Sequence, residues 1–176
     1  MLLKKFFIER KTKRAVKKST VSRENISFRN SKSIGIIYSW EGKRKAEVIN
    51  DFAKELEIAG KKVQILCFSR VDLRVIPVLI DFFRDSDFSY FGKIKSNKLN
   101  DFINLRFDFL YHLDTTQNVY IENVMAQSKA RCRVSRADHI KKDLYDFMIQ
   151  TKGNVGIETL CNEILRYSKA LINNVH

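Results

Sequence analysis

From Ser33 onward, short apolar runs alternate with segments of helical periodicity, and this alternation constrains the fold of the 176-residue chain more than any other feature. The run SIGIIYS at 33–39 predicts a buried strand. Residues 43–59 keep their apolar side chains on one helical face and end at Gly60, and residues 63–68 predict a second strand. A unit of this kind implies a parallel pair of strands with a right-handed crossover.

The alternation continues to the C-terminus. It predicts strands at 88–92, 107–113, 131–135 and 145–150, and helices after Ser96, at 118–129 and at 156–173. Only the stretch 70–87 shows no pattern, because Pro77 disfavours both a continuous helix and a central strand. The sequence therefore predicts an α/β fold: a three-layer Rossmann-like sandwich around a mainly parallel sheet of five or six strands. By analogy with such folds its strand order is 3-2-1-4-5, with 33–39 central.

The positive charge is concentrated at the N-terminus. The whole chain carries a formal net charge of +13. Residues 1–32 hold eleven basic and two acidic side chains, a net +9, which leaves +4 for the remaining 144 residues. We therefore expect two parts, a basic N-terminal helix and linker at 1–32 and a Rossmann-like α/β domain at 33–176.

The basic segment has three interpretations. Residues 2–18 contain no Gly or Pro and predict a helix, in which Leu2, Leu3, Phe6 and Phe7 share one face. The helix could be an arm that binds nucleic acid through phosphates. It could lie in a membrane interface, with the apolar residues in the bilayer and the lysines on anionic headgroups. It could also be a solvated helix whose apolar end docks on its own domain.

A second group of basic residues, at 131–136, would extend this surface if its side chains face solvent. The candidate nucleic-acid-binding residues are Lys4, Lys5, Arg10, Lys11, Lys13, Arg14, Lys17, Lys18, Arg131, Arg133 and Arg136. No RNA-recognition motif accompanies them.

The carboxyl ends of the predicted strands are where ligands bind in a fold of this kind. The candidate ligand site there consists of Ser39, Trp40, His112, Asp114 and Gly153. The loop at 39–43 matches neither the dinucleotide-binding glycine pattern nor the P-loop. The alternative is that these residues have structural roles only: Trp40 is a partly buried aromatic, Asp114 a turn or cap residue and Gly153 part of an ordinary turn.

Other chemistries find no support. The three cysteines, Cys67, Cys132 and Cys161, form no closely spaced pair and predict buried apolar positions rather than disulfides. The histidines show no metal-ligand spacing, so no metal site is predicted, and no cofactor is expected. Because no nucleophile motif accompanies His112 and Asp114, we assign no catalytic residue, and the sequence leans away from an enzyme.

The chain has no apolar run long enough for a transmembrane helix, and its N-terminus does not match a secretory signal. We expect a cytoplasmic protein. If the basic helix lies in a membrane interface, the protein would be peripheral to the inner membrane.

Four segments together resemble a family of short bacterial proteins that contain a domain of unknown function. They are the basic N-terminal helix, SIGIIYSWEGKRKAEVINDFAKEL, FDFLYHLDTTQNVYIENVMAQSKARCRVSR and YDFMIQTKGNVGIETLCNEILRY. The resemblance implies a fold and brings no activity. The third segment also looks like the N-terminal Rossmann half of ADP-heptose-type glycosyltransferases, although the chain has no room for their second half.

Two hypotheses about function follow. The first is a non-enzymatic protein that associates with RNA or the ribosome through its basic arm, while its α/β domain contacts a protein or a shaped RNA surface. The second is an α/β domain that binds a small molecule or nucleotide at the strand ends, a glycosyltransferase-like remnant among the options. A membrane-surface protein is the third alternative.

Overall fold

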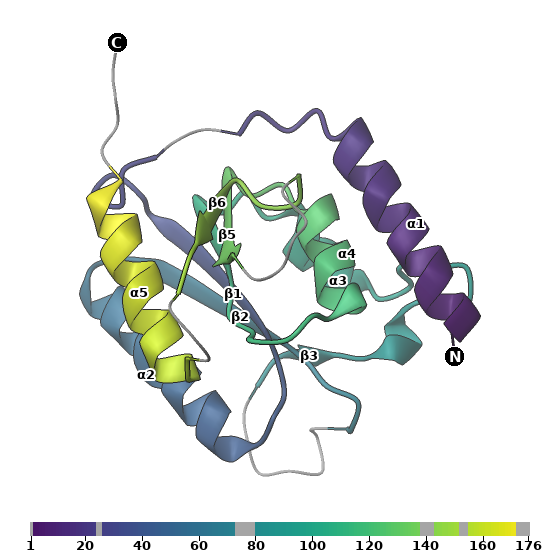
Figure 1. The fold of residues 1–176 in the computed structure, drawn as a ribbon, viewed down its shortest axis with the longest axis horizontal. Helices are drawn as coiled ribbons and strands as arrows, with labels where there is room; N and C mark the ends of the chain where they lie inside the picture. The colour runs from purple at the N-terminus through teal and green to yellow at the C-terminus, as the bar shows by residue number, and fades with distance from the viewer. Residues whose placement is uncertain (1, 24–25, 73–79, 138–142, 152–154, 172–176) are drawn as a thin grey trace.

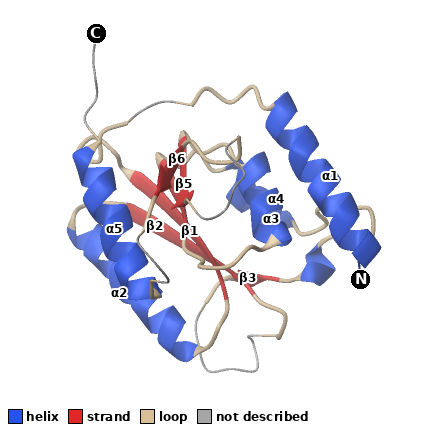
Figure 2. Ribbon diagram, in the orientation of Figure 1, coloured by secondary structure: helices blue, strands red, loops and turns tan. Residues whose placement is uncertain are grey.

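The computed structural model describes residues 2–23, 26–72, 80–137, 143–151 and 155–171 of the chain. Its centre is one sheet of six parallel strands in the order β3-β2-β1-β4-β5-β6 (Figures 1 and 2). The strands are β1 (Ser33–Ser39), β2 (Lys62–Phe68), β3 (Phe82–Phe83), β4 (Phe109–His112), β5 (Cys132–Arg136) and β6 (Phe147–Ile149).

Helices cover both faces of the sheet. They are α1 (Leu2–Lys18), α2 (Lys43–Ile58), α3 (Asn97–Asn104), α4 (Val119–Gln127) and α5 (Ile157–Ala170), with a short 3₁₀ turn, η2, at Asp85–Asp87. Helices α2 and α5 lie on one face, α3 and α4 lie on the other, and α1 packs on the outside of α4 (Figure 1). The predicted three-layer α/β sandwich with a helical N-terminal extension is confirmed.

The central strand is apolar throughout because both of its faces are buried. Successive side chains of a strand point to opposite faces, so Ile36 and Tyr38 join the core under α2 and α5, whereas Ile37 joins the core under α3 and α4. This explains why the sequence of β1 shows a continuous apolar run rather than an alternation. Strand β1 pairs with β2 on one side and with β4 on the other.

Several local predictions are confirmed. Gly60 lies just after α2 with a positive φ of 79°, a conformation that costs glycine little. The Ser96 side chain caps α3 by accepting a hydrogen bond from the Leu99 backbone N–H at 3.3 Å. The strand order also agrees with the predicted 3-2-1-4-5 and extends it by β6 at one edge.

The predicted strand at 88–92 is wrong. Phe88 makes only an isolated antiparallel bridge to Ile94, and Gly92 turns the chain between them with a φ of 72°. The third strand is instead β3, within the stretch that showed no pattern. Its two residues are too few to show a periodicity, and backbone hydrogen bonds such as that from Ser69 N to Phe83 O, at 2.9 Å, hold it against β2.

Helix α1 is docked on the domain by its middle. Ile8 and Thr12 are buried, and the Asn123 side chain of α4 donates to the Thr12 hydroxyl at 3.0 Å and to the Ile8 carbonyl at 3.4 Å. A Cβ at Gly92 would lie only 3.0 Å from Ile8 Cγ1, so the turn at Gly92 can approach α1 closely because it carries no side chain. The N-terminal segment is therefore part of the folded structure.

Candidate functional site

The carboxyl edge of the sheet holds a buried polar network centred on Asp114, two residues after β4. The carboxylate is fully buried and accepts hydrogen bonds from Ser39 N at 2.8 Å and from Ser39 Oγ at 2.6 Å. The Lys45 ammonium, which α2 supplies, lies 2.7 Å from Asp114 Oδ1 and 2.8 Å from Glu41 Oε1. The network thus joins the ends of β1 and β4 to the start of α2.

The charges in this network stabilise one another against the cost of burial. Burial alone would raise the pKa of Asp114, but the hydrogen bond from His112 and the Lys45 ammonium outweigh it and lower that pKa to about 2. Burial alone would likewise lower the pKa of Lys45, and the carboxylates of Asp114 and Glu41 raise it above its usual value. Both groups are therefore charged at neutral pH.

His112 extends the network toward β6. Its Nε2 lies 3.3 Å from Asp114 Oδ2, and its Nδ1 lies 2.7 Å from the Tyr145 hydroxyl. An ionised carboxylate only accepts hydrogen bonds, so Nε2 carries the proton in this contact, and in a neutral ring Nδ1 accepts from Tyr145. Burial raises the pKa of Tyr145, which keeps its hydroxyl a donor.

The arrangement around Ser39 differs from that of a hydrolase. Ser39 Oγ donates a hydrogen bond to Asp114 and accepts one from Asn118 Nδ2 at 2.9 Å. The hydroxyl proton of Ser39 therefore points to the carboxylate and not to His112. A serine nucleophile needs its hydroxyl hydrogen-bonded to a base that can take the proton. The residues that the structure describes also contain no cluster of three His, Cys, Asp or Glu side chains suited to a metal ion. The network positions the loops around it.

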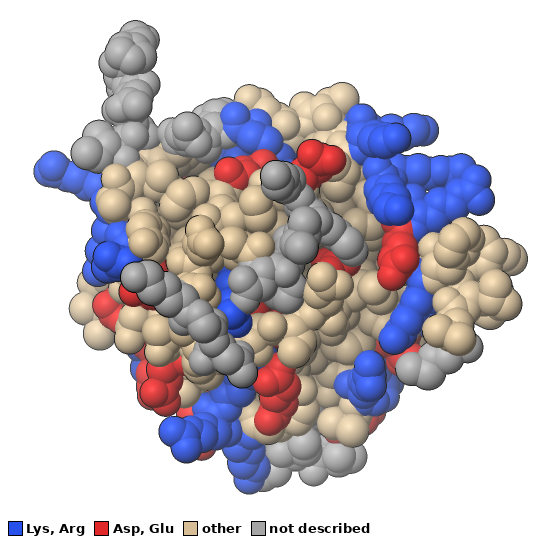
Figure 3. Space-filling view, in the orientation of Figure 1, with Lys and Arg blue, Asp and Glu red and all other residues tan. Residues whose placement is uncertain are grey.

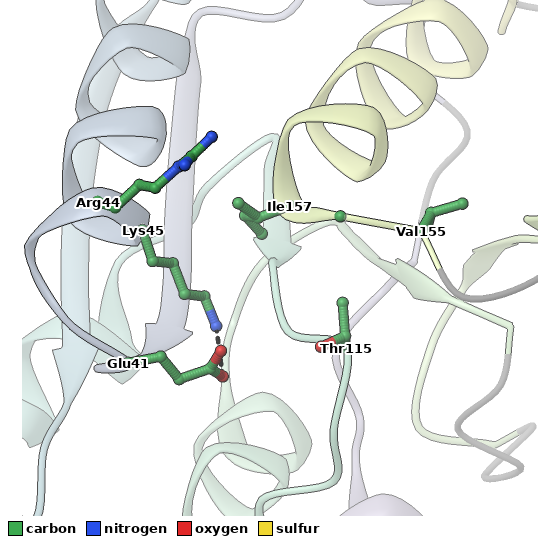
Figure 4. A pocket seen from close by; sticks show the side chains of 7 residues that line it. Glu41, Arg44, Lys45, Thr115, Val155 and Ile157 are labelled. Atoms are coloured by element: carbon green, nitrogen blue, oxygen red, sulfur yellow. Dashed lines mark hydrogen bonds and ion pairs between the residues drawn. The ribbon is translucent and has the colours of Figure 1, made fainter.

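Two hollows flank the network. The first, of about 410 Å³, lies between the starts of α2 and α5 and is lined by Glu41, Arg44, Lys45 and Thr115 among others. Figure 4 shows the Lys45 ammonium and the Glu41 carboxylate meeting at one side of it, with Thr115 and Ile157 opposite. The charges of Lys45 and Glu41 on this side of the hollow already pair with each other.

The second hollow, of about 370 Å³, lies on the other side of the network. Segments far apart in the sequence contribute to it: α1, the ends of β1 and β2, and the start of α4. Its lining residues are Lys5, Ser39, Trp40, Glu41, Phe68, Arg70, Val71, Thr116, Gln117, Asn118, Val119 and Tyr120. It therefore combines aromatic walls with two cationic side chains.

The candidate ligand residues come together in part. Ser39 and His112 both contact Asp114, and Trp40, which follows Ser39, lines the second hollow. Gly153 lies outside the described residues. The interpretation of Asp114 as a cap or turn residue predicts hydrogen bonds within its own loop. In the structure its carboxylate binds Ser39 at the end of β1 and Lys45 of α2.

Sequence reasoning missed several members of the network. Lys45 is the clearest case, because it lies on the apolar face of the predicted helix at 43–59, one turn before Ile49, and a lysine on a buried face signals a buried partner. Asn118 is the N-cap of α4 and donates to Ser39 as well. Tyr145 gave no signal, because a tyrosine at a strand start is common.

The outer surface of α1 is a second candidate site. The residues opposite Ile8 on the helix are exposed, with apolar side chains at the N-terminal end and mainly cations beyond them. The exposed cations are Arg10, Lys13, Arg14, Lys17 and Lys18, and Glu9 is an exposed acid beside them. Lys4, Lys5 and Lys11 are half-buried at the sides, where the Lys4 ammonium donates to the Asp85 carbonyl at 2.5 Å. Figure 3 shows Lys and Arg gathered over α1 and uncharged side chains at its N-terminal end.

That uncharged end is an exposed apolar patch, which we call the apolar tip. Leu2, Leu3 and Phe6 are 86%, 60% and 58% exposed, and Phe91 of the adjoining loop is 64% exposed. Phe7 holds the loop to the helix, with its ring centroid 5.3 Å from that of Phe91. The helix thus docks on its domain, as one interpretation expected. Phe7 of the predicted apolar face contacts Phe91, and Ile8 and Thr12 are buried, whereas the rest of that face stays exposed.

The second basic group does not extend the surface of α1. Arg133 is buried and forms a two-bond fork with Asp146, with Nε and Nη2 each 3.0 Å from a carboxylate oxygen. Arg136 is also buried, and Arg131 is largely shielded and pairs with Asp108 at 3.1 Å. The sequence predicted that these arginines extend the basic surface if their side chains face solvent. Arg133 and Arg136 do not, because both side chains lie inside the domain.

Comparison with known proteins gives one assignment. The model of a family described as "Family of unknown function (DUF6913)" matches residues 4–171. The chain belongs to this family. The match includes nearly all of α1, so the N-terminal helix is part of what the family model describes together with the α/β fold. No curated protein and no solved structure matches the chain.

Proposed function

We propose that this protein is a binding protein that docks on an anionic membrane surface through the outer face of α1. The observation that carries the proposal is the apolar tip beside a row of exposed cations on one rigid helix. Soluble proteins rarely leave a contiguous group of large apolar side chains in water unless a partner covers it.

The two halves of this face suit two layers of a membrane. Leu2, Leu3 and Phe6, with Phe91 beside them, would enter the boundary between headgroups and acyl chains. Arg10, Lys13, Arg14 and Lys17 would lie over the headgroups, where each Lys or Arg near an anionic surface contributes about 1 kcal/mol. The four cations together therefore represent roughly 4 kcal/mol of attraction at low salt.

This mode of binding needs no membrane-spanning helix. Within the part of the chain that the structure describes, no helix has both the length and the apolar character that a span requires. Lys13, Arg14 and Lys17 of α1 are exposed and make no ion pair with any described residue, so their charge is available to a partner.

RNA, the polyanion that the sequence favours, is the competing partner. Exposed cations would attract phosphates of either kind, and counterion release makes both kinds of binding sensitive to salt. The apolar tip separates the two, because exposed leucine side chains gain free energy from burial in a lipid phase and gain little from a phosphate backbone.

The test is flotation of the purified full-length protein with lipid vesicles. Phosphatidylcholine vesicles are compared with vesicles that also contain phosphatidylglycerol, and single-stranded RNA is assayed at the same salt. We expect binding to the anionic vesicles only. Replacement of Arg10, Lys13, Arg14 and Lys17 by Ala should weaken it roughly a hundredfold or more, and Leu3→Ser with Phe6→Ser should weaken it about tenfold or more.

A matched control removes the same charge elsewhere. Lys43, Arg44, Lys54 and Lys62 are exposed on other parts of the surface, and their replacement by Ala should leave vesicle binding nearly unchanged. Equal losses in the two charge variants, or RNA binding that is tighter than vesicle binding and indifferent to Phe6, would contradict the proposal.

A further inference from the structure

The hollow between α1 and the sheet lies at the topological switch point of the fold. The chain leaves β1 toward α2 on one face and leaves β4 toward α4 on the other, and β1 and β4 are neighbours (Figure 1). Two adjacent strands whose connections diverge in this way leave a crevice at their carboxyl ends, which is where open parallel sheets bind ligands. The second hollow described above occupies this crevice.

Two cations in this hollow have no partner within the described structure. Lys5 of α1 and Arg70 after β2 line it, and neither makes a hydrogen bond or an ion pair with any described residue. The acid beside them, Glu41, is already bound to Lys45 at 2.8 Å. The hollow therefore presents unneutralised positive charge from two segments 65 positions apart in the chain.

The remaining walls suit a planar ring. Trp40, Phe68 and Tyr120 line the hollow, and the rings of Phe68 and Tyr120 stack at 5.0 Å and 12° to form a rigid side. Trp40 is half-buried and is held at the end of β1 by a hydrogen bond from its backbone N–H to the Phe68 carbonyl at 2.7 Å. Its ring packs in part against the core under α2 and α5, and its indole N–H makes no hydrogen bond with any described residue, so the exposed part of the ring can contact a ligand.

The size of the hollow fits a small molecule. Its volume of about 370 Å³ falls at the lower end of the range of roughly 300–1,000 Å³ for small-molecule sites. A ligand that satisfies both cations must be an anion, and one that uses the aromatic wall must carry a ring.

From these contacts we infer that the crevice binds a nucleoside phosphate, with Lys5 and Arg70 on the phosphate and the base against Trp40. Arg70 offers a fork of donors that matches phosphate oxygens, and Lys5 adds a point charge. An indole face stacks on any base. This inference does not depend on the membrane proposal, because Lys5 lines the hollow, and the cations assigned to the membrane are exposed and do not line it.

The protein carries its own probe for this site. Trp40 is the only tryptophan in the chain, so intrinsic fluorescence reports directly on the hollow. Full-length protein is titrated with the four nucleoside 5′-monophosphates, with adenosine, with inorganic phosphate and with glycerol 3-phosphate, the last as a soluble mimic of a lipid headgroup. We expect a saturable change with at least one nucleotide, and at least tenfold weaker binding of the three other probes.

Matched variants assign the binding to this hollow. Lys5→Ala and Arg70→Ala should each weaken nucleotide binding by about tenfold or more, as expected for the loss of a charge-assisted hydrogen bond. Lys13→Ala, on the outer face of the same helix, should leave it unchanged, and circular dichroism checks that all three variants fold.

Three results would overturn the inference. The first is no saturable change with any nucleotide, and the second is an equal loss in Lys13→Ala and Lys5→Ala, which would indicate general polyanion binding. The third is glycerol 3-phosphate binding as tightly as the nucleotides, which would assign the hollow to a headgroup. Because the membrane proposal is tested with the outer-face variants and this inference with Lys5→Ala and Arg70→Ala, a failure here leaves the membrane proposal standing, and the converse also holds.

Discussion

The carboxyl edge of the sheet and the outer face of α1 use charged side chains in opposite ways. At the sheet edge, Asp114 and Lys45 are buried, and each has its charge offset by a partner within hydrogen-bond distance. On α1, Lys13 and Arg14 project into solvent without an ion pair among the described residues. Charge of the first kind is committed to the fold, and charge of the second kind is available for a partner. Net charge alone does not distinguish the two.

The largest expected effect comes from breaking the committed pair. Asp114→Ala leaves the Lys45 ammonium buried without its closest anion, and the loss of one partner from a buried pair costs roughly 3–5 kcal/mol of unfolding free energy. Urea denaturation followed by circular dichroism measures it. Asp51→Ala, which removes an exposed carboxylate from the pair with Lys54, is the control and should cost less than about 0.5 kcal/mol. A cost below 1 kcal/mol for Asp114→Ala would show that the network is not structural.

The arginines sharpen the same comparison within one residue type. Arg133→Ala removes a buried fork to Asp146 and should lower the unfolding free energy by about 2–3 kcal/mol. Arg14→Ala should change it by less than about 0.5 kcal/mol, because an exposed side chain without partners contributes little to stability. Vesicle binding should show the reverse order. Comparable stability losses in the two variants would remove the distinction between committed and available charge.

Acid should weaken the sheet edge specifically. The pKa of Asp114 is lowered from 3.8 to about 2, so its contribution to stability is complete above the unfolded value of 3.8 and is lost as the pH falls toward 2. The loss from this one group is about 2 kcal/mol. We expect the unfolding free energy of the Asp114→Asn variant to fall less than that of the unaltered protein over this pH interval. Parallel pH profiles would contradict the assignment of the low pKa to Asp114.

A smaller effect is expected where α1 meets the loop at Gly92. Gly92→Ala places a Cβ 3.0 Å from Ile8 Cγ1 and forces a φ of 72° on a residue that disfavours it. The cost should be about 1 kcal/mol, concentrated at the docking of α1. Hydrogen exchange should therefore accelerate in α1 and remain unchanged in β1 and β4. Uniform acceleration over the whole chain would instead indicate global destabilisation.

Much of the fold could be predicted from the sequence because both faces of the sheet are apolar. Strand β1 and helix α2 are long, and Gly60 marks the end of the helix, so periodicity identifies them. Strand β3 has two residues, held by backbone hydrogen bonds that carry no sequence signal. The local sequence pattern was sufficient to predict helices of several turns and strands longer than β3.

The sites were predictable only in part, because their properties depend on tertiary contacts. Ser39, His112 and Asp114 follow from their places at strand ends, but Asp114 finds Lys45 only once α2 has packed on the sheet. In α1, Phe6 and Ile8 look alike in the sequence. Ile8 is buried because it packs against Asn123 and Gly92, whereas Phe6 lies on the other side of the helix and is exposed.

The most direct test of the account is the environment of the apolar tip at a membrane. All three cysteines are buried, so an environment-sensitive nitrobenzoxadiazole probe will label a new surface cysteine selectively. Leu3→Cys places the probe on the tip, where Leu3 is 60% exposed, and Ile58→Cys places it at another exposed apolar position at the end of α2, where Ile58 is 88% exposed. Each labelled protein is mixed with vesicles containing phosphatidylglycerol. The account predicts a blue shift and increased emission for the probe at position 3 and no change at position 58. An unchanged spectrum at position 3, or equal shifts at both positions, would contradict it.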